Sequence, residues 1–209
     1  MSGFLSDPLL HPGWPARLTA GPVQVQPLRR ADARDWVGLR LTNEEWLAPW
    51  EPSAPLPWRQ RHTPAAFRAM RRASARRARG GLAVPFAVRV DGRLAGQVTV
   101  DNVVRGALRS GHLGYWIDRA VSGRGMAGLA VALVCDHAFG PVGLHRLQAD
   151  IRPENVRSRR LVERLGFRRE GLLRRYLDID GDWRDHVSYA LLAEDVPGGV
   201  LARWRAGAP

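Results

Sequence analysis

Two runs of alternating apolar and polar residues flank the dipeptide Asp91-Gly92, and they constrain the fold more than any other feature. The runs are Val84 to Val90 and Leu94 to Val100. Alternation with a period of two is typical of a half-buried strand, and Asp-Gly favours the primed turn that matches strand twist. The sequence therefore predicts an antiparallel hairpin, and hence a sheet that contains antiparallel strands.

After this hairpin, strands and helices alternate along the chain. The patterns predict a strand over 111–118, a helix over 125–139, a strand over 146–151, a helix over 156–165 and a second hairpin around Asp180-Gly181. Antiparallel hairpins followed by a strand–helix–strand–helix–strand unit indicate a mixed α/β domain of the α+β class with one sheet.

The region before the first hairpin predicts a strand near residues 23–28 and a helix over 30–50, which the prolines of 49–57 must end. Thr63-Pro64 is typical of a helix start, with the hydroxyl as N-cap and proline in the first turn. No internal repeat is evident. We expect one domain over 23–195, with a loosely attached N-terminal arm over 1–22 and a C-terminal tail over 196–209.

Composition favours a cytoplasmic location and an anionic ligand. No apolar run is long enough for a membrane span, and the first residues do not resemble a secretory signal. The single cysteine, Cys135, excludes an internal disulfide and a multi-cysteine metal site, and its apolar neighbours favour a core role over a catalytic thiol. The net charge of +12 is carried entirely by arginine and favours a nucleotide cofactor or a ribonucleoprotein surface.

Arginines crowd the helix that Thr63-Pro64 begins. A basic helix of this kind is usually a solvated face, and base stacking on nucleic acid would need interleaved aromatic residues, of which only Phe67 is near. We therefore favour a solvated face over a nucleic-acid contact. The arginines concerned are Arg68, Arg71, Arg72, Arg76, Arg77 and Arg79.

A glycine-containing turn joins the strand of 111–118 to the helix of 125–139. Gly123 and Gly125 allow the backbone to approach a ligand closely, and the N-terminus of the helix favours phosphate. Alternatively, the glycines make only a tight connection. The Gly-Lys-Ser/Thr of a P-loop is absent, because the chain contains no lysine.

A second element follows the strand of 146–151. Asn155-x-x-Ser158 begins a helix that Leu165-Gly166-Phe167 ends. Taken alone, Asn155 is an ordinary N-cap and Gly166 an ordinary helix stop. The combination of this element with the preceding glycine turn, in this order, is far more specific.

With these motifs, the chain resembles the GNAT superfamily of acetyl-CoA-dependent acyltransferases, and within it the RimJ/RimL type that acetylates the N-termini of ribosomal proteins. The segment 122–127, Ser-Gly-Arg-Gly-Met-Ala, is similar to the cofactor loop of that superfamily, although Ser122 departs from its usual first residue. The segments 43–50, 155–167 and 170–186 resemble the same branch. The likeness covers about residues 23–195.

This resemblance implies a seven-stranded mixed sheet whose two central strands splay apart around the pantetheine arm of acetyl-CoA. The backbone of a bulged strand would pair with that arm and present an oxyanion donor near Trp116 and Ile117. The following loop would hold the pyrophosphate, and Asn155 would bond the pantetheine. The implied cofactor-binding residues are Trp116, Ile117, Asp118, Arg124, Gly125, Met126, Ala127, Gly128, Leu129 and Asn155.

Acetyl transfer also needs a proton donor for the leaving thiolate and a way to deprotonate the amine. Ser158 is the candidate donor, with a plain helix-turn hydroxyl as its alternative. Relatives place a glutamate where this chain has Leu177, so the base is open between the adjacent Asp178, Glu51 and a chain of water molecules. Tyr176 and His112 are lesser candidates, and for any one carboxylate plain surface charge is the favoured alternative.

The resemblance places the acceptor beside Trp46, Trp50 and Tyr176, although tryptophans four residues apart on a helix are usually core. An α-amino group, with a pKa near 7.7–8.0, is easier to deprotonate than a lysine near 10.4, which favours a protein N-terminus, such as that of a ribosomal protein. The alternatives are a small amine, such as an antibiotic or polyamine, and an RNA-binding module on the same scaffold. Either a monomer or a homodimer is compatible with the sequence.

Overall fold

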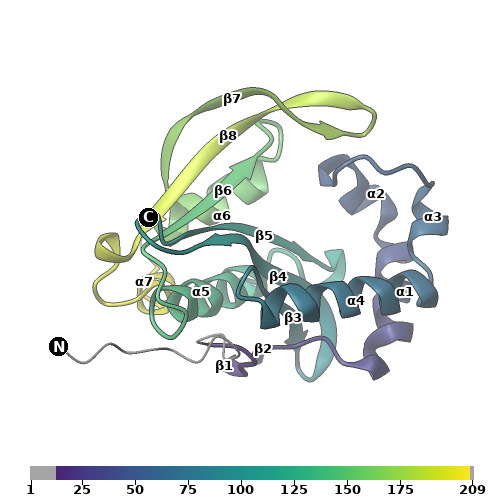
Figure 1. Cartoon of the computed structure of the whole chain (residues 1–209), viewed down its shortest axis with the longest axis horizontal. Coiled ribbons are helices and arrows are strands. Elements are labelled where there is room, and N and C mark those ends of the chain that lie inside the picture. Colours follow the sequence, from purple (N-terminus) through teal and green to yellow (C-terminus); the bar gives the residue numbers. More distant parts are fainter. Residues whose placement is uncertain (1–12, 208–209) are drawn as a thin grey trace.

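One eight-stranded sheet organises the molecule, in the order β1-β2-β3-β4-β5-β6-β8-β7 (Figure 1). The structure is a computed structural model that describes residues 13–207. Neighbouring strands are antiparallel except for the parallel pair β5–β6. The strands are β1 (Leu18–Ala20), β2 (Val23–Gln26), β3 (Val84–Val90), β4 (Arg93–Val104), β5 (Ser110–Ile117), β6 (Arg146–Ile151), β7 (Arg168–Ile179) and β8 (Asp182–Leu192).

Helices cover both faces of the sheet (Figure 1). The apolar helix α5 packs with α6 and α7 against the main core, which includes Phe86, Leu147 and Tyr189. On the opposite face, α1 and α4 enclose a smaller cluster around Trp36 and Phe67. The helices are α1 (Ala33–Thr42), α2 (Glu44–Leu47), α3 (Trp58–Arg61), α4 (Pro64–Arg79), α5 (Met126–Phe139), α6 (Val156–Leu165) and α7 (Val200–Arg205), with short 3-10 turns at Arg30–Asp32, Ala48–Trp50, Arg119–Val121 and Ala193–Asp195.

The predicted mixed α+β fold is confirmed, and so are both predicted hairpins. Asp91 and Gly92 have φ values of 48° and 79°, and Asp180 and Gly181 have 55° and 78°, as a primed turn requires. At the start of α4 the Thr63 side chain accepts a hydrogen bond from the N–H of Ala66. Local turn and cap chemistry therefore decides these elements.

The expected number of strands was wrong by one, because the segment assigned to a loose arm contributes β1. Leu18 to Ala20 pairs with Val23 to Val25, and Trp14 packs against Phe86 with 5.5 Å between ring centroids. The rest of the expected arm, residues 1–12, lies outside the described residues. The expected helix over 30–50 is divided, because α1 ends at Thr42 and α2 begins at Glu44.

The C-terminal tail also joins the domain through α7. The carboxylate of Asp136, on α5, accepts hydrogen bonds from the N–H groups of Val200 (2.6 Å) and Leu201 (3.0 Å) at the start of α7. This side chain satisfies donors that the first turn of a helix leaves free. Among residues 13–207, no helix combines the length and the apolar character that crossing a bilayer requires.

Candidate active site

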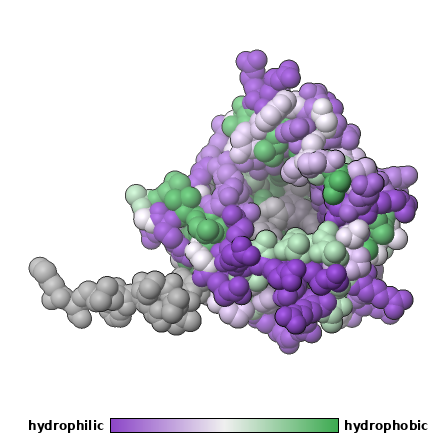
Figure 2. Space-filling view, turned by 45° about the vertical axis from the view of Figure 1, so that its right-hand side comes forward, coloured by the Kyte–Doolittle hydropathy of each residue, from purple (hydrophilic) through white to green (hydrophobic). Residues whose placement is uncertain are grey.

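A gap opens between the two central parallel strands. Only three residue pairs join β5 to β6, and the last is His112 with Gln148. β5 continues beyond this pair to Ile117, and β6 continues to Ile151, but the two strands do not pair with each other there. The expected splay between central strands is therefore present. Figure 2 shows a hollow in the surface of the molecule.

One hydrogen bond at the end of β5 shows which backbone amides of this strand point towards β4 and which point towards the gap. The N–H of Asp118 donates to the carbonyl of Ala95 in β4 at 2.7 Å. Since direction alternates along a strand, the N–H of Trp116 also faces β4, and those of Tyr115 and Ile117 face the gap. Of the three residues expected to pair with a pantetheine arm, Ile117 therefore has its amide towards the gap, whereas Trp116 and Asp118 do not.

The expected bulge near Trp116 and Ile117 is also wrong. These residues pair regularly with Gln97 and Gly96, and the irregularity between β4 and β5 lies instead between Asp101 and Val104. Unpaired amides at the gap thus arise from the missing strand partner and need no bulge.

The loop after β5 delivers the N-terminus of α5 to the same end of the gap. Gly125 is the N-cap residue of α5 and has a left-handed φ of 78°, which favours glycine. The N–H groups of Met126, Ala127 and Gly128 belong to the first turn, where a helix offers no internal acceptor. They form an anion site together with the positive end of the helix dipole.

The other residues expected to hold the pyrophosphate divide by role. The N–H of Leu129 already donates to the carbonyl of Gly125 at 3.1 Å, so it is not available to a ligand. A Cβ on Gly128 would lie 2.1 Å from Cζ2 of Trp204 in α7, so this glycine allows α7 to pack closely. Arg124 is exposed in the loop, where its guanidinium can reach an anion from solvent.

On the opposite side of the gap, Asn155 and Ser158 lie at the start of α6. The Asn155 side chain caps the helix by accepting from the N–H of Ser158 at 3.2 Å, which leaves its amide nitrogen for a ligand. The Ser158 hydroxyl lies 2.6 Å from the hydroxyl of Tyr115 on β5. Burial raises the pKa of Tyr115 above its ordinary value, so this phenol remains protonated. The two hydroxyls form a bridge across the gap.

Trp46 and Trp50 form part of the wall that faces the sheet. The indole N–H of Trp46 donates to the carbonyl of Ile117 at 3.1 Å, and the guanidinium of Arg157 stacks 3.8 Å from its ring centroid. Arg152 lies over Trp50 and donates to the carbonyl of Pro49 at 2.8 Å. Both rings are half-buried. These contacts join the segment of Trp46 and Trp50 to β5, to the residue that follows β6, and to α6.

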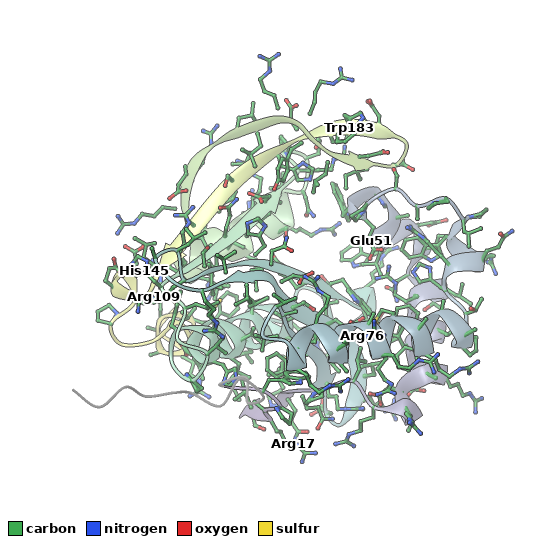
Figure 3. All side chains as sticks on the ribbon, in the orientation of Figure 1. Arg17, Glu51, Arg76, Arg109, His145 and Trp183 are labelled. Atoms are coloured by element: carbon green, nitrogen blue, oxygen red, sulfur yellow. The ribbon has the colours of Figure 1, made fainter. Side chains whose placement is uncertain are left out.

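Glu51, which is labelled in Figure 3, forms an ion pair with a buried arginine. Arg40 forms a salt bridge with Glu51, and its guanidinium lies 4.7 Å from the Trp58 ring centroid and 5.0 Å from that of Trp116. Its Nε donates to Nε2 of His62 at 3.1 Å. The Glu51 side chain is 26% exposed. This carboxylate therefore lies at the edge of the hollow, with its charge compensated from behind.

Asp178 lies in a contact between the β7–β8 hairpin and the loop after α2. The Ser53 hydroxyl donates to the Asp178 carboxylate at 2.6 Å and accepts from the N–H of Gly181 at 2.8 Å. Pro52 forms an isolated bridge with Ile179. Asp178 is exposed. Its carboxylate fastens the hairpin tip to the α2 side, and its predicted role as a base stays a prediction.

A carboxylate that the sequence analysis did not single out lies on β6. Asp150 accepts both hydrogen bonds of the Gln148 amide, each at 3.1 Å, and hydrogen-bonds Tyr176 of β7. Burial, with the charge of Asp150, raises the pKa of Tyr176. The signal available from sequence was alternation: Gln148 and Asp150 are the polar residues of a strand whose other face is core.

These features define a class of protein. A parallel strand pair that opens into a gap, with a glycine-capped helix N-terminus at one end and a hydroxyl bridge across it, suits a thioester carrier with a diphosphate. Residues 23–168 match the family described as the acetyltransferase (GNAT) domain. The chain belongs to this family, as the sequence motifs predicted.

Individual relatives agree with this assignment. The chain is 41% identical to Mycobacterium smegmatis RimJ, solved in complex with CoA-disulfide, over 94% of this chain and 97% of that one, with a TM-score of 0.90. It is 28% identical to the ribosomal-protein-S5-alanine acetyltransferase of Vibrio fischeri, over 86% of this chain and 98% of that one, with a TM-score of 0.78.

Among curated proteins, the chain is 40% identical over 106 residues to the ribosomal protein uS5-alanine N-acetyltransferase of Escherichia coli. That alignment covers 50% of this chain and 55% of the relative. The chain thus spans about half the length of the curated relatives it matches, so the family assignment is firmer than any transfer of substrate.

Proposed function

We propose that this protein transfers an acetyl group from acetyl-CoA to the α-amino group of a protein N-terminus. The observation that carries the proposal is the Tyr115–Ser158 hydroxyl pair at the edge of a strand gap that the α5 N-terminus adjoins. Acetyl-CoA would supply a thioester whose leaving sulfur needs a proton, and a hydroxyl bridge at the gap is suited to supply it.

The chain's own groups divide the remaining work. The first-turn amides of α5, together with Arg124, would hold the diphosphate. The Tyr115 and Ile117 amides are directed into the gap, where they would orient the arm and stabilise charge on the carbonyl oxygen. The Asn155 amide nitrogen would bond the arm from the other side. Trp46 and Trp50 would exclude water from the acceptor's path.

A protein N-terminus is the acceptor that the chemistry favours. An α-amino group is partly neutral near pH 7.5, whereas a lysine amine at this pH is almost wholly protonated. A ribosomal protein is the particular acceptor we propose, because relatives in two bacteria are named for alanine acetylation of the small-subunit protein S5. The net charge of +12 favours the anionic co-substrate and disfavours a small polycation.

Thiol release and intact-mass measurement test this proposal together. Peptides that begin with alanine or serine and contain no lysine are compared with N-terminally blocked peptides that contain one lysine, and with a polyamine. We expect acetyl-CoA-dependent release and one added acetyl group on the free N-termini alone. Equal modification of the blocked lysine peptides, or of the polyamine alone, would refute the proposed acceptor.

A further inference from the structure

Strand register places Asp150 at the position where the gap opens. His112 and Gln148 form the last pair between β5 and β6. Paired residues of parallel strands share a face, and side chains two positions on lie on that same face. Gly114 on β5 and Asp150 on β6 are therefore the first residues on this face that the open gap separates.

The space beside Gly114 is empty of protein. Gly114 is exposed, and a Cβ built on it would meet no atom within 4 Å. Its φ lies outside the left-handed range, so backbone conformation alone does not require glycine. Asp150 thus borders an open position at the strand gap.

This position lies opposite the hydroxyl pair. Tyr115 packs with the core on the α5 and α6 face, and its hydroxyl meets Ser158 there. Side chains alternate along β5, so Gly114 belongs to the other face, which also carries Trp116 and the wall around Arg40. A group reacting in the gap would have hydroxyls on one side and the Asp150 carboxylate on the other.

The other two candidate carboxylates each have a structural role. Glu51 is the counter-ion of the buried Arg40, and removing it would leave that guanidinium unpaired. Asp178 fastens the hairpin to Ser53. Asp150, by contrast, accepts hydrogen bonds from neutral donors, the Gln148 amide and the Tyr176 hydroxyl, and its charged neighbour Arg146 forms a salt bridge with Glu170.

We propose that Asp150 is the general base that takes a proton from the acceptor amine, an inference that rests on the proposed acetyltransferase activity. Gln148 and Tyr176 are positioning residues that orient its carboxylate towards the space beside Gly114. The sequence resemblance implies a carboxylate at the position of Leu177 and assigns no role to Asp150.

The reaction balances with one base and one relay. The acceptor ammonium gives one proton to Asp150, and the neutral nitrogen attacks the thioester carbonyl carbon, so that a C–N bond forms. The C–S bond then breaks as the tetrahedral carbon becomes an amide. The nitrogen's second proton reaches the departing sulfur through the Ser158 hydroxyl, which donates one proton and takes up another. Asp150 finally returns its proton to water.

Charged and titratable groups surround Asp150 from three strands. Arg146 belongs to β6 itself, Arg152 follows the end of β6 and acts on His186, Tyr176 faces Asp150 from β7, and His186 faces it from β8. Burial lowers the pKa of His186 although the Asp150 charge opposes this, so that imidazole is neutral near pH 7. The pH-dependence of an Asp150 variant must therefore be compared with that of variants at these neighbouring residues.

The test is the isosteric substitution Asp150→Asn, assayed by thiol release with an N-terminal peptide at pH 7 and pH 9. We expect kcat to fall about 100-fold at pH 7 and by much less at pH 9, where the α-amine is already mostly neutral. Asp150→Glu should recover part of the rate, and His186→Gln should retain the wild-type pH-dependence. The matched control Asp91→Asn, in an exposed hairpin turn that tolerates either residue, should match wild type.

Two results would overturn the proposal. One is wild-type turnover by Asp150→Asn, and the other is an equal loss at both pH values, which indicates a structural role. If wild type releases no thiol with any acceptor, the proposed function fails and not this inference alone. If Asp150→Asn does not fold, the variant Gly114→Val tests the same site by filling the space beside Asp150. Gly114→Val should fold normally and lower kcat/KM for the peptide about tenfold or more. Unchanged activity of this variant would place the reaction elsewhere.

Discussion

The Ser158 hydroxyl is the residue on which the proton donor hypothesis depends. Ser158→Ala should lower kcat about 100-fold, because the leaving sulfur loses its proton source, while the Kd for coenzyme A changes less than threefold. Rapid thiol-release kinetics and calorimetric titration measure the two quantities. Tyr115→Phe, which removes only the bridging hydroxyl, should cause a smaller loss in kcat. A Ser158→Ala enzyme with weaker binding and unchanged kcat would show a binding role instead.

His62 gives the fold a dependence on pH that is independent of the reaction. Its Nδ1 donates to the Trp58 carbonyl at 2.8 Å and its Nε2 accepts from Arg40, so the ring is held neutral. Burial, with the charge of Arg40, lowers the pKa of His62 to about 4.

Between pH 6.5 and about 4, the unfolded chain therefore binds a proton that the folded chain does not. Stability should fall as pH decreases through this window, with a slope of up to about 1.4 kcal/mol per pH unit from this group. Urea unfolding of wild type and His62→Gln at pH 7, 6 and 5 measures the difference. Parallel curves for the two proteins would contradict the assignment.

At the scale of single residues, local chemistry predicted Asn155 and Ser158 but not Asp150. A helix cap can be inferred from adjacent residues, and the structure has this cap at Asn155. The Asp150–Tyr176 contact instead depends on an irregularity in β7 between Leu173 and Leu177, where Arg175 has a φ of 46°. Strand alternation cannot anticipate such a shift in register.

Among the elements, helix α7 depends on a glycine far away in sequence. A methyl group on Gly128 would overlap the Trp204 ring, so Gly128→Ala should displace α7 and destabilise the protein by about 1–3 kcal/mol. The matched control is Gly38→Ala in α1, where a Cβ meets no atom within 4 Å and helix propensity predicts a gain of up to about 1 kcal/mol. Urea unfolding compares the two variants, and equal stability would contradict the packing described here.

The elements divide into those that local patterns define and those that distant contacts define. The start predicted for α4 and the bounds predicted for β6 and α6 agree with the structure, because a cap, alternation and a glycine stop mark them. The strand β1 is only three residues long, and α7 is capped by Asp136 across 64 positions. Neither has a local signal, and both were therefore assigned to a flexible arm or tail.

At the scale of the whole molecule, two layers of helices and an opened sheet bring the reacting groups together. The hydroxyl pair approaches the gap from the α5 and α6 face, and Asp150 borders it on the α1 and α4 face. The β7–β8 hairpin, fastened at Ser53, arches over the second face (Figures 1 and 3).

The central claim is that this gap joins acetyl-CoA to a free protein N-terminus, and one competition measures it most directly. A single peptide with both a free N-terminal alanine and an internal lysine is incubated with acetyl-CoA and the enzyme at pH 7.5, and fragment masses locate the added group. The account predicts acetylation of the N-terminal nitrogen in at least tenfold excess over the lysine, from the difference in their pKa values. Acetylation of the lysine in preference, or of neither amine, would contradict it.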